Sequence, residues 1–326
     1  MQGIYDILIE NRRMQYKFTI RRNITVIRGD SATGKTTLVE MIQEYNDNGP
    51  ESGITLQCKK ECIVLTGKYW QNALDGIKDS IVFIDEGNRF ALSADFAKKI
   101  QDTSNYYVII TRERLENIPY SVEEIYGIRN SGKYGSLQKT YHEMFHLYND
   151  FPVTPPVCFD CLIVEDSNSG YQFFQACCKA QNISCLSANG KSNIFACTSK
   201  QKDKKILIIA DGAAFGPEIG RMHHLVNVQK NIHLFLPESF EWLLLSAKFI
   251  ENKQMDSILE TPANYIDSQK YFSWEQFFTS TLIHLTKGTI WSYQKKSLNP
   301  VYLHENNRIR ILAVASPVLD SLEGKS

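Results

Sequence analysis

A glycine-containing turn between a strand-like and a helix-like segment constrains the fold of this chain most strongly. Residues 29–36 read GDSATGKT and match the spacing G-x-x-x-x-G-K-[ST] in full. Residues 24–27 (ITVI) before the turn are all β-branched and mostly apolar, whereas residues 37–42 after it are typical of a helix. Glycines let several backbone N–H groups point at one anion, and the helix N-terminus adds a favourable dipole. The pattern therefore predicts a phosphate-binding loop.

The lysine and threonine that end this motif indicate a nucleoside triphosphate with Mg²⁺. Lys35 is expected to reach the β and γ phosphates, and the Thr36 hydroxyl is expected to contact Mg²⁺. ATP is the expected nucleotide, with GTP left open as an alternative. The residues expected to contact the nucleotide are Gly29, Asp30, Ser31, Ala32, Thr33, Gly34, Lys35, Thr36 and Thr37.

Two further strand-like runs end in polar residues suited to hydrolysis. Residues 81–84 (IVFI) precede Asp85 and Glu86, and residues 107–110 (YVII) precede Thr111 and Arg112. Ligands collect at the carboxyl ends of parallel strands, so these side chains are expected near the phosphates. Asp85 would hold the Mg²⁺ shell and Glu86 would activate the attacking water. Thr111 would sense the γ-phosphate, and Arg112 would stabilise the transferred charge.

On these motifs, residues 1–150 resemble the P-loop NTPases that have an added strand and a catalytic glutamate, the group of the AAA and ABC ATPases. Alternating residues at 4–9 and 14–20 predict a β-hairpin before the loop, which is similar to ABC-type heads. The segment at 92–95 (LSAD) has no glycine, unlike the LSGGQ signature. The resemblance thus implies an ATPase and does not extend to an ABC-type sandwich dimer.

A second alternation of strands and helices follows a proline-rich segment at 151–157. We expect an α/β fold throughout, with an ATPase domain at 1–150, a linker at 151–157, a second α/β domain at 158–250 and a mainly helical region at 251–326. The expected strands of the second domain are residues 161–164, 183–186, 206–209 and 232–236. A helix is expected between these strands at residues 171–180, and further helices are expected after the last strand at residues 240–249 and 274–285.

Acidic residues follow two strands of this second domain. Glu165 comes directly after residues 161–164, and Asp211 comes shortly after residues 206–209. Carboxylates at neighbouring strand ends face the same crevice, where they are suited to bind Mg²⁺. The sequence therefore predicts a second metal site at Glu165 and Asp211.

This arrangement resembles a Toprim domain, which has a Glu after its first strand and D-x-D-x-x-G after a later one. Asp211 matches the first Asp and Gly216 the glycine, but Ala213 replaces the second Asp, which weakens metal binding. Compensation by Asp166 or Glu218 stays open. A P-loop ATPase joined to a Toprim domain is similar to the OLD family. That resemblance implies that ATP turnover controls DNA cleavage, in defence against phage or mobile elements. We expect the second domain to act on DNA or RNA.

Several alternatives remain open at this point. A response-regulator receiver has similar acidic strand ends, but its lysine is missing here, since Pro237 and Glu238 follow the last strand. A non-catalytic ATP-dependent switch would use the second domain as a surface for a partner protein or another copy of the chain. The second domain could also be a degenerate α/β unit whose acidic strand ends bind nothing.

Histidines and cysteines suggest two weaker metal sites. Residues 142–146 (HEMFH) match the helical zinc motif H-E-x-x-H, although no third ligand is evident. Four cysteines could form a zinc site, but their spacing favours buried or edge thiols. These four are Cys58, Cys62, Cys158 and Cys161.

Charge and hydropathy limit the class of protein. Lys+Arg and Asp+Glu balance at 36 each among 326 residues, so a generally basic, nucleic-acid-coating protein is not expected. No apolar run is long enough to span a bilayer, and the sequence begins with a strand pattern. We expect a cytoplasmic protein with no membrane partner, in which the eight cysteines are reduced.

Overall fold

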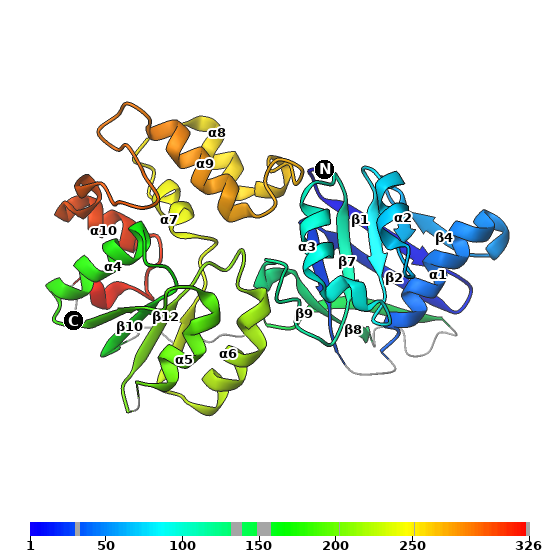
Figure 1. The fold of residues 1–326 in the computed structure, drawn as a ribbon, viewed down its shortest axis with the longest axis horizontal. Helices are drawn as coiled ribbons and strands as arrows, with labels where there is room; N and C mark the ends of the chain where they lie inside the picture. Colours follow the sequence, from blue (N-terminus) through cyan, green and yellow to red (C-terminus); the bar gives the residue numbers. More distant parts are fainter. Residues whose placement is uncertain (30–32, 132–138, 149–157, 202, 251, 324–326) are drawn as a thin grey trace. The chain divides into compact units, whose positions relative to one another are not determined.

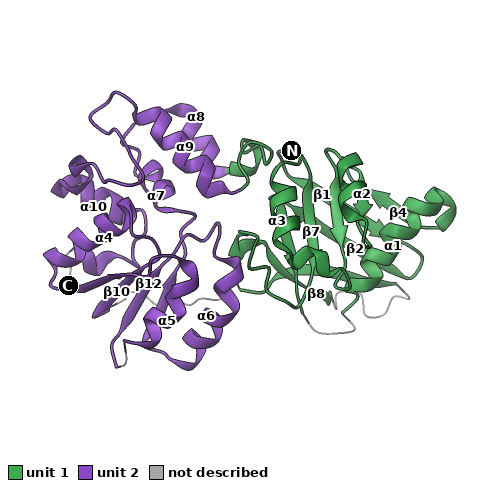
Figure 2. Cartoon of the chain, viewed as in Figure 1, with its two compact units in different colours: residues 1–149, 261–272 green, residues 150–260, 273–326 purple. Residues whose placement is uncertain are grey.

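The structure is a computed structural model that describes residues 1–29, 33–131, 139–148, 158–201, 203–250 and 252–323. Its contacts divide the chain into two units (Figure 2). Unit 1 consists of Met1–Asn149 with Thr261–Phe272, and unit 2 consists of Asp150–Glu260 with Ser273–Ser326. Each unit contains a β-sheet with helices, so the predicted α/β class is confirmed. The predicted linker at 151–157 lies outside the described residues.

Unit 1 is built on a nine-stranded mixed sheet in the order β4-β1-β2-β9-β8-β3-β7-β6-β5 (Figure 1). Strands β8, β3, β7, β6 and β5 run parallel to one another, and this part of the sheet carries the glycine loop. The strands are β1 (Tyr5–Glu10), β2 (Met14–Ile20), β3 (Ile24–Ile27), β4 (Thr55–Gln57), β5 (Cys62–Val64), β6 (Ile81–Ile84), β7 (Tyr106–Ile110), β8 (Ile125–Asn130) and β9 (Thr140–His146).

The predicted hairpin is confirmed by β1 and β2, which pair in antiparallel register from Tyr5 with Ile20 to Glu10 with Gln15. The Asn11 side chain closes the turn, since its Oδ1 accepts the backbone N–H groups of Arg13 and Met14 at 2.8 Å each.

The α-helices in the described part of unit 1 are α1 (Lys35–Asn48), α2 (Trp70–Gly76) and α3 (Ala94–Gln101). Ser93 is the predicted N-cap of α3, and its Oγ does accept the Phe96 N–H at 3.1 Å. Phe96 is buried, and its ring packs against those of Trp70 and Phe90. The cap therefore starts α3 where its apolar face meets the core.

A late segment of the chain, Thr261–Phe272, belongs to unit 1 (Figure 2). The Ala263 carbonyl accepts the Gly3 N–H at 2.7 Å, and the Phe272 carbonyl accepts the Asn23 amide at 2.7 Å. Ser268 N–H donates to the Met1 carbonyl at 2.9 Å. Because buried backbone groups need such partners, this segment completes unit 1.

Unit 2 has a four-stranded, all-parallel sheet in the order β11-β10-β12-β13. Its central strands read CLIV and ILII and are buried along their whole length, as expected of a sheet covered on both faces. The strands are β10 (Cys161–Val164), β11 (Ser184–Ser187), β12 (Ile206–Ile209) and β13 (Ile232–Phe235), close to the predicted positions.

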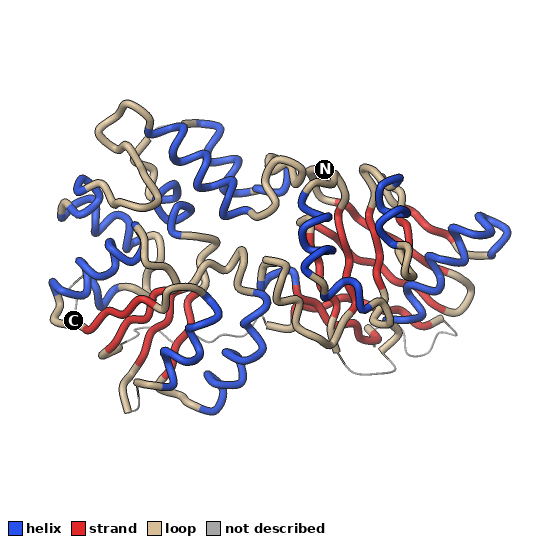
Figure 3. The backbone as a smooth tube through the Cα atoms, viewed as in Figure 1, coloured by secondary structure: helices blue, strands red, loops and turns tan. Residues whose placement is uncertain are grey.

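Helices make up most of the rest of unit 2 (Figure 3). Ser273 and Gln276 form a capping box at the start of α9, which fixes where that helix begins. The helices are α4 (Ser169–Ala180), α5 (Ile194–Ser199), α6 (Gly216–Val228), α7 (Phe240–Ser246), α8 (Lys253–Glu260), α9 (Trp274–Thr286) and α10 (Glu305–Ala313). No helix in the described part of either unit is long and apolar enough to cross a membrane.

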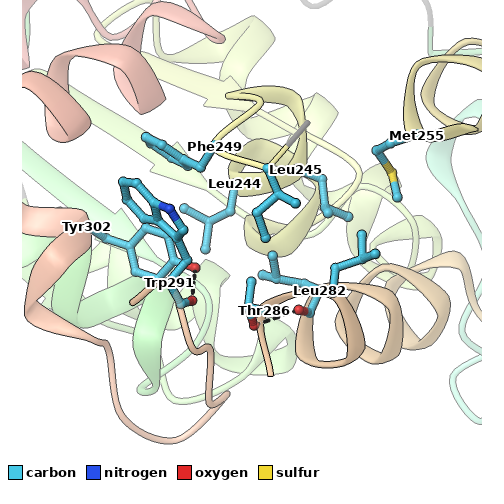
Figure 4. Close-up of a pocket in the computed structure, with 10 residues that line it drawn as sticks. Leu244, Leu245, Phe249, Met255, Leu282, Thr286, Trp291 and Tyr302 are labelled. Carbon is cyan, nitrogen blue, oxygen red and sulfur yellow. Dashed lines mark hydrogen bonds between the residues drawn. The ribbon is translucent and has the colours of Figure 1, made fainter. Parts of the chain in front are cut away.

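A small apolar cavity lies beside α7 and α9 (Figure 4). Leu244, Leu282 and Trp291 line it, and Tyr302 donates its hydroxyl to the Trp291 carbonyl at 2.6 Å. Its free space of about 20 Å³ would hold about one water molecule. We interpret this cavity as a packing gap rather than a ligand site.

Candidate functional site

The glycine loop joins the end of β3 to the start of α1, as its sequence predicts. Gly29 and Gly34 both adopt positive φ, +127° and +89°, which side chains disfavour. Of the predicted contact residues, Asp30, Ser31 and Ala32 lie outside the described residues. Glycine therefore suits both of these positions.

Gly34 is also fixed by two side chains from neighbouring strands. Tyr16 on β2 donates its hydroxyl to the Gly34 carbonyl at 2.8 Å, and its ring stacks on His142 of β9 with centroids 4.4 Å apart. A Cβ at position 34 would lie 2.7 Å from the Tyr16 hydroxyl oxygen and 3.0 Å from His142 Cε1. A side chain there would require Tyr16 or the loop to move. Burial raises the pKa of Tyr16 to about 12, so its hydroxyl stays a donor at neutral pH.

Lys35 points back over the loop. Its Nζ donates to the Gly29 carbonyl and to Thr33 Oγ1, each at 2.9 Å. Thr36 is exposed and Thr37 is half-buried in the first turn of α1. The ammonium group is therefore held at the loop, where it can meet an anion bound to the amides.

The four residues expected to serve hydrolysis follow adjacent strands. Strand β7 lies between β3 and β6, with Ile110 opposite Ile27 and Ile109 opposite Ile84. The ends of these parallel strands therefore share one edge of the sheet with the glycine loop. At this edge, Arg112 Nε and Glu86 Oε1 form an ion pair of 2.9 Å, a contact that their separate sequence motifs did not reveal.

Asp85 and Thr111 occupy more enclosed positions. The Asp85 Oδ1 atom is buried and has no hydrogen-bond partner within the described residues. Thr111 is buried, and its Oγ1 accepts the Glu113 N–H at 3.0 Å. A buried carboxylate oxygen that lacks a donor fits a role in accepting bonds from the water shell of Mg²⁺. Asp85 and Thr36 are the residues that would hold such an ion.

The H-E-x-x-H segment is a strand, not a helix. His142 and His146 lie in β9, where the former stacks on Tyr16 and the latter packs against Tyr126. Residues four apart in a strand are separated by about 13 Å, so these imidazoles do not share an ion. The helical zinc site, which the sequence left only as a weaker alternative, is therefore not formed, because both histidines lie in a strand.

The second acidic site lies at the carboxyl ends of β10 and β12, which are neighbours in the unit 2 sheet. The Asp211 N–H donates to Glu165 Oε2 at 3.0 Å, so the structure brings the two predicted residues together. Burial raises the pKa of Glu165 to about 7. Burial, and then the nearby Glu275, raise the pKa of Asp211 well above its usual value.

Four more charged residues face this site, and the sequence reasoning missed them. Glu241 and Glu275 lie in the first turns of α7 and α9, and both act electrostatically on Asp211. Lys191 Nζ donates to the Ala214 carbonyl at 2.8 Å, and Lys295 pairs with Glu275. Glu241 could have been found, because it follows β13 at the same edge of the sheet. Glu275 and the lysines carry no comparable signal.

The two residues considered as replacements for the missing acid lie near this site, since Asp166 acts electrostatically on Asp211 and Glu218 on Lys191. Asp166 Oδ1 accepts the Tyr171 N–H at 2.8 Å at the start of α4, and Glu218 is buried in the first turn of α6. A cavity with about 20 Å³ of free space touches Glu165, Asp166 and Asp211, enough for one particle the size of a water molecule.

The donor set for a cation at this site is small. The described residues contain no group of three or more His, Cys, Asp or Glu side chains that could hold a metal ion. Glu165 and Asp211 could supply two carboxylates, so Mg²⁺ would take its other ligands from water or substrate. Comparison with protein-family models and with curated proteins gave no match for this chain.

Proposed function

We propose that unit 1 is a P-loop ATPase of the catalytic-glutamate class, with ATP and Mg²⁺ as its ligands. The observation that carries this proposal is the position of β7 between β3 and β6. This order brings Glu86 and Arg112 to the sheet edge that also carries Lys35 and its glycine loop. In the resemblance drawn from the sequence, an added strand is the defining feature of this class.

Each residue then has a role in the proposed reaction. Lys35 and the loop amides bind the β and γ phosphates, while Thr36 and Asp85 hold the Mg²⁺ shell. When bound, Mg²⁺ would neutralise negative charge on the phosphates. Once its ion pair with Arg112 opens, Glu86 accepts the proton of the attacking water. Arg112 then stabilises the charge that develops on the phosphate. Thr111 senses the γ-phosphate from the end of β7.

Nucleotide binding and turnover test this proposal on the full chain. Wild-type protein should bind ATP, and Lys35→Ala should weaken binding at least tenfold with an unchanged circular dichroism spectrum. Glu86→Gln should keep binding and lose turnover, which separates the binding role from the hydrolytic one. GTP measured alongside decides the nucleotide. Normal turnover by Lys35→Ala would overturn the assignment.

For unit 2 we propose a Toprim-like site that acts on DNA or RNA under the control of the ATP state. The four-stranded parallel sheet and the contact between Asp211 and Glu165 at its carboxyl edge support this. Such a protein would belong to defence against phage or mobile elements and would work in the cytoplasm.

A second candidate is a switch without nuclease activity, in which unit 2 binds a partner protein or another copy of the chain. Two observations favour it. Ala213 removes one carboxylate of the family pattern, and Lys191 and Lys295 already stand among the remaining acids.

Metal-dependent cleavage separates the two candidates. Purified protein would be incubated with DNA and with tRNA, with and without ATP, in Mg²⁺ or Mn²⁺. The nuclease proposal expects cleavage that Glu165→Ala and Asp211→Ala abolish while ATP turnover remains. Cleavage that survives both changes would rule out this site as its source. ATP-dependent oligomerisation without cleavage would favour the switch.

A further inference from the structure

Asn88 joins two loops at the carboxyl edge of the unit 1 sheet. It lies three residues after Asp85, in the connection that follows β6. Its Nδ2 donates to the Asp85 carbonyl at 3.1 Å, and its Oδ1 accepts the Thr66 hydroxyl at 3.1 Å and the Gly67 N–H at 3.2 Å. Thr66 and Gly67 follow β5, the edge strand next to β6. One side chain therefore ties together the ends of two adjacent strands.

The partners of the Asn88 amide fix its orientation. The Asp85 carbonyl only accepts and the Gly67 N–H only donates, so Nδ2 must face the former and Oδ1 the latter. The backbone N–H of Asn88 also donates to the Asp85 carbonyl, at 3.0 Å, which closes a turn over residues 85–88. Two bonds from Asn88 therefore hold the peptide group that joins Asp85 to Glu86.

This turn carries two residues of the proposed ATPase site, Asp85 and Glu86. The Glu86 side chain is paired with Arg112 in the structure. Once that ion pair opens, as the proposed reaction requires, the position of the Glu86 carboxylate depends on its backbone. Because a displacement of about 1 Å can cost roughly a hundredfold in rate, whatever holds this backbone should affect turnover.

Aromatic packing holds the same two segments together independently of Asn88. The ring of Trp70 stacks on that of Phe90 with centroids 5.1 Å apart, and both rings pack against buried Phe96. Trp70 is the first residue of α2, after the Thr66 loop, and Phe90 lies two residues after Asn88. Loss of the Asn88 amide should therefore leave the segments in contact and change chiefly the turn that bears Glu86.

We propose that Asn88 is a positioning residue for ATP hydrolysis, which holds the peptide group before Glu86 so that the carboxylate can meet the attacking water. This inference rests on the proposed ATPase function of unit 1. Asn88 acts through Glu86 and exchanges no proton itself. Lys35 and its loop follow β3, which β7 separates from β6. Binding of ATP should therefore not depend on Asn88.

The first test compares ATP binding, turnover and thermal unfolding of the full chain with those of Asn88→Ala. We expect kcat to fall roughly tenfold or more, Kd for ATP to stay within about twofold of the wild type, and Tm to fall by no more than about 4 °C. Asn117→Ala is the matched control, because Asn117 donates to the Leu92 carbonyl at 2.9 Å further along the same connection. A wild-type kcat in Asn88→Ala, or an equal loss in Asn117→Ala, would overturn the inference.

A double variant separates positioning of Glu86 from a general weakening of the fold. In single-turnover measurements, Glu86→Gln combined with Asn88→Ala should be no slower than Glu86→Gln alone, because Asn88 acts through Glu86. A further loss of roughly tenfold in the double variant would show that Asn88 acts in some other way. Wild-type protein that neither binds nor hydrolyses ATP would instead refute the ATPase proposal, and this inference with it.

Discussion

The hydroxyl of Tyr16 and the carbonyl of Gly34 are joined by a hydrogen bond of 2.8 Å. The hairpin strand β2 is therefore linked to the start of helix α1. The hydroxyl also occupies the space that any side chain at position 34 would need. The glycine of the motif is therefore required by its φ of +89° and by this close contact together. The tyrosine ties the antiparallel part of the sheet to the candidate phosphate site.

Replacing Gly34 with alanine should disrupt the loop. The added Cβ would lie 2.7 Å from the Tyr16 hydroxyl oxygen, so either Tyr16 or the loop must move. We expect a loss of about 2–3 kcal/mol in the free energy of unfolding, from strain and the displaced contact, and at least tenfold weaker ATP binding. Gly53→Ala is the matched control, because Gly53 also has positive φ but open space around its Cα. Equal effects from the two changes would contradict the role of Tyr16.

Replacing Arg112 with alanine should affect turnover more than stability. Arg112 and Glu86 are 53% and 39% exposed, so their ion pair contributes less than about 1 kcal/mol to folding. We expect kcat for ATP hydrolysis to fall at least tenfold with little change in Tm. Lys99→Ala, which breaks a similarly exposed pair with Asp75, should leave kcat unchanged. A wild-type kcat in Arg112→Ala would remove this arginine from the mechanism.

The buried Glu124 should make unit 1 less stable as pH rises. Burial raises its pKa from 4.5 to about 7, although Arg22 and Thr25 act in the opposite direction. The folded state therefore binds more protons than the unfolded state between these values. The contribution of Glu124 to the free energy of unfolding is fully present below about pH 4.5 and is lost as pH rises through about 7. The loss is at most roughly 3 kcal/mol.

Thermal unfolding from pH 4.5 to 8 checks this prediction. Glu124→Gln should flatten the decline in stability toward high pH, because the amide does not ionise. Glu123→Gln, at the exposed neighbouring position, should show the same dependence of stability on pH as the wild type. A Glu124→Gln profile parallel to the wild type would show that this carboxyl does not govern the slope.

Replacing Lys191 with methionine should strengthen divalent-cation binding at the second site. The Lys191 ammonium lies among Glu165, Asp211, Glu218 and Glu275, where it repels an incoming cation. Removing one positive charge at this range should tighten Mn²⁺ binding about tenfold. The exposed Lys200→Met is the control, and isothermal titration gives both affinities. If Lys191→Met binds Mn²⁺ no tighter, this lysine does not face the site.

Strand and helix positions near the motifs could be predicted from the sequence because their patterns are local. The apolar runs at β6 and β12 and the Ser93 cap lie where the sequence places them. The contact between Asp211 and Glu165 follows from the rule that parallel strands end at one edge.

What the sequence could not predict depends on long-range pairing. Strand β9 was not predicted, because the spacing of His142 and His146 fits one face of a strand as well as of a helix. Glu275 approaches Asp211 from a helix more than sixty residues away, and the ion pair of Arg112 with Glu86 joins two different strand ends. No local pattern encodes these contacts.

The return of residues 261–272 to unit 1 means that neither unit is one uninterrupted piece of polypeptide. A gene fragment that stops after β9 would leave the Gly3 amide and the Asn23 side chain without their carbonyl acceptors. To express unit 1 alone, residues 261–272 would have to be fused to it. To express unit 2 alone, Glu260 would have to be joined directly to Ser273.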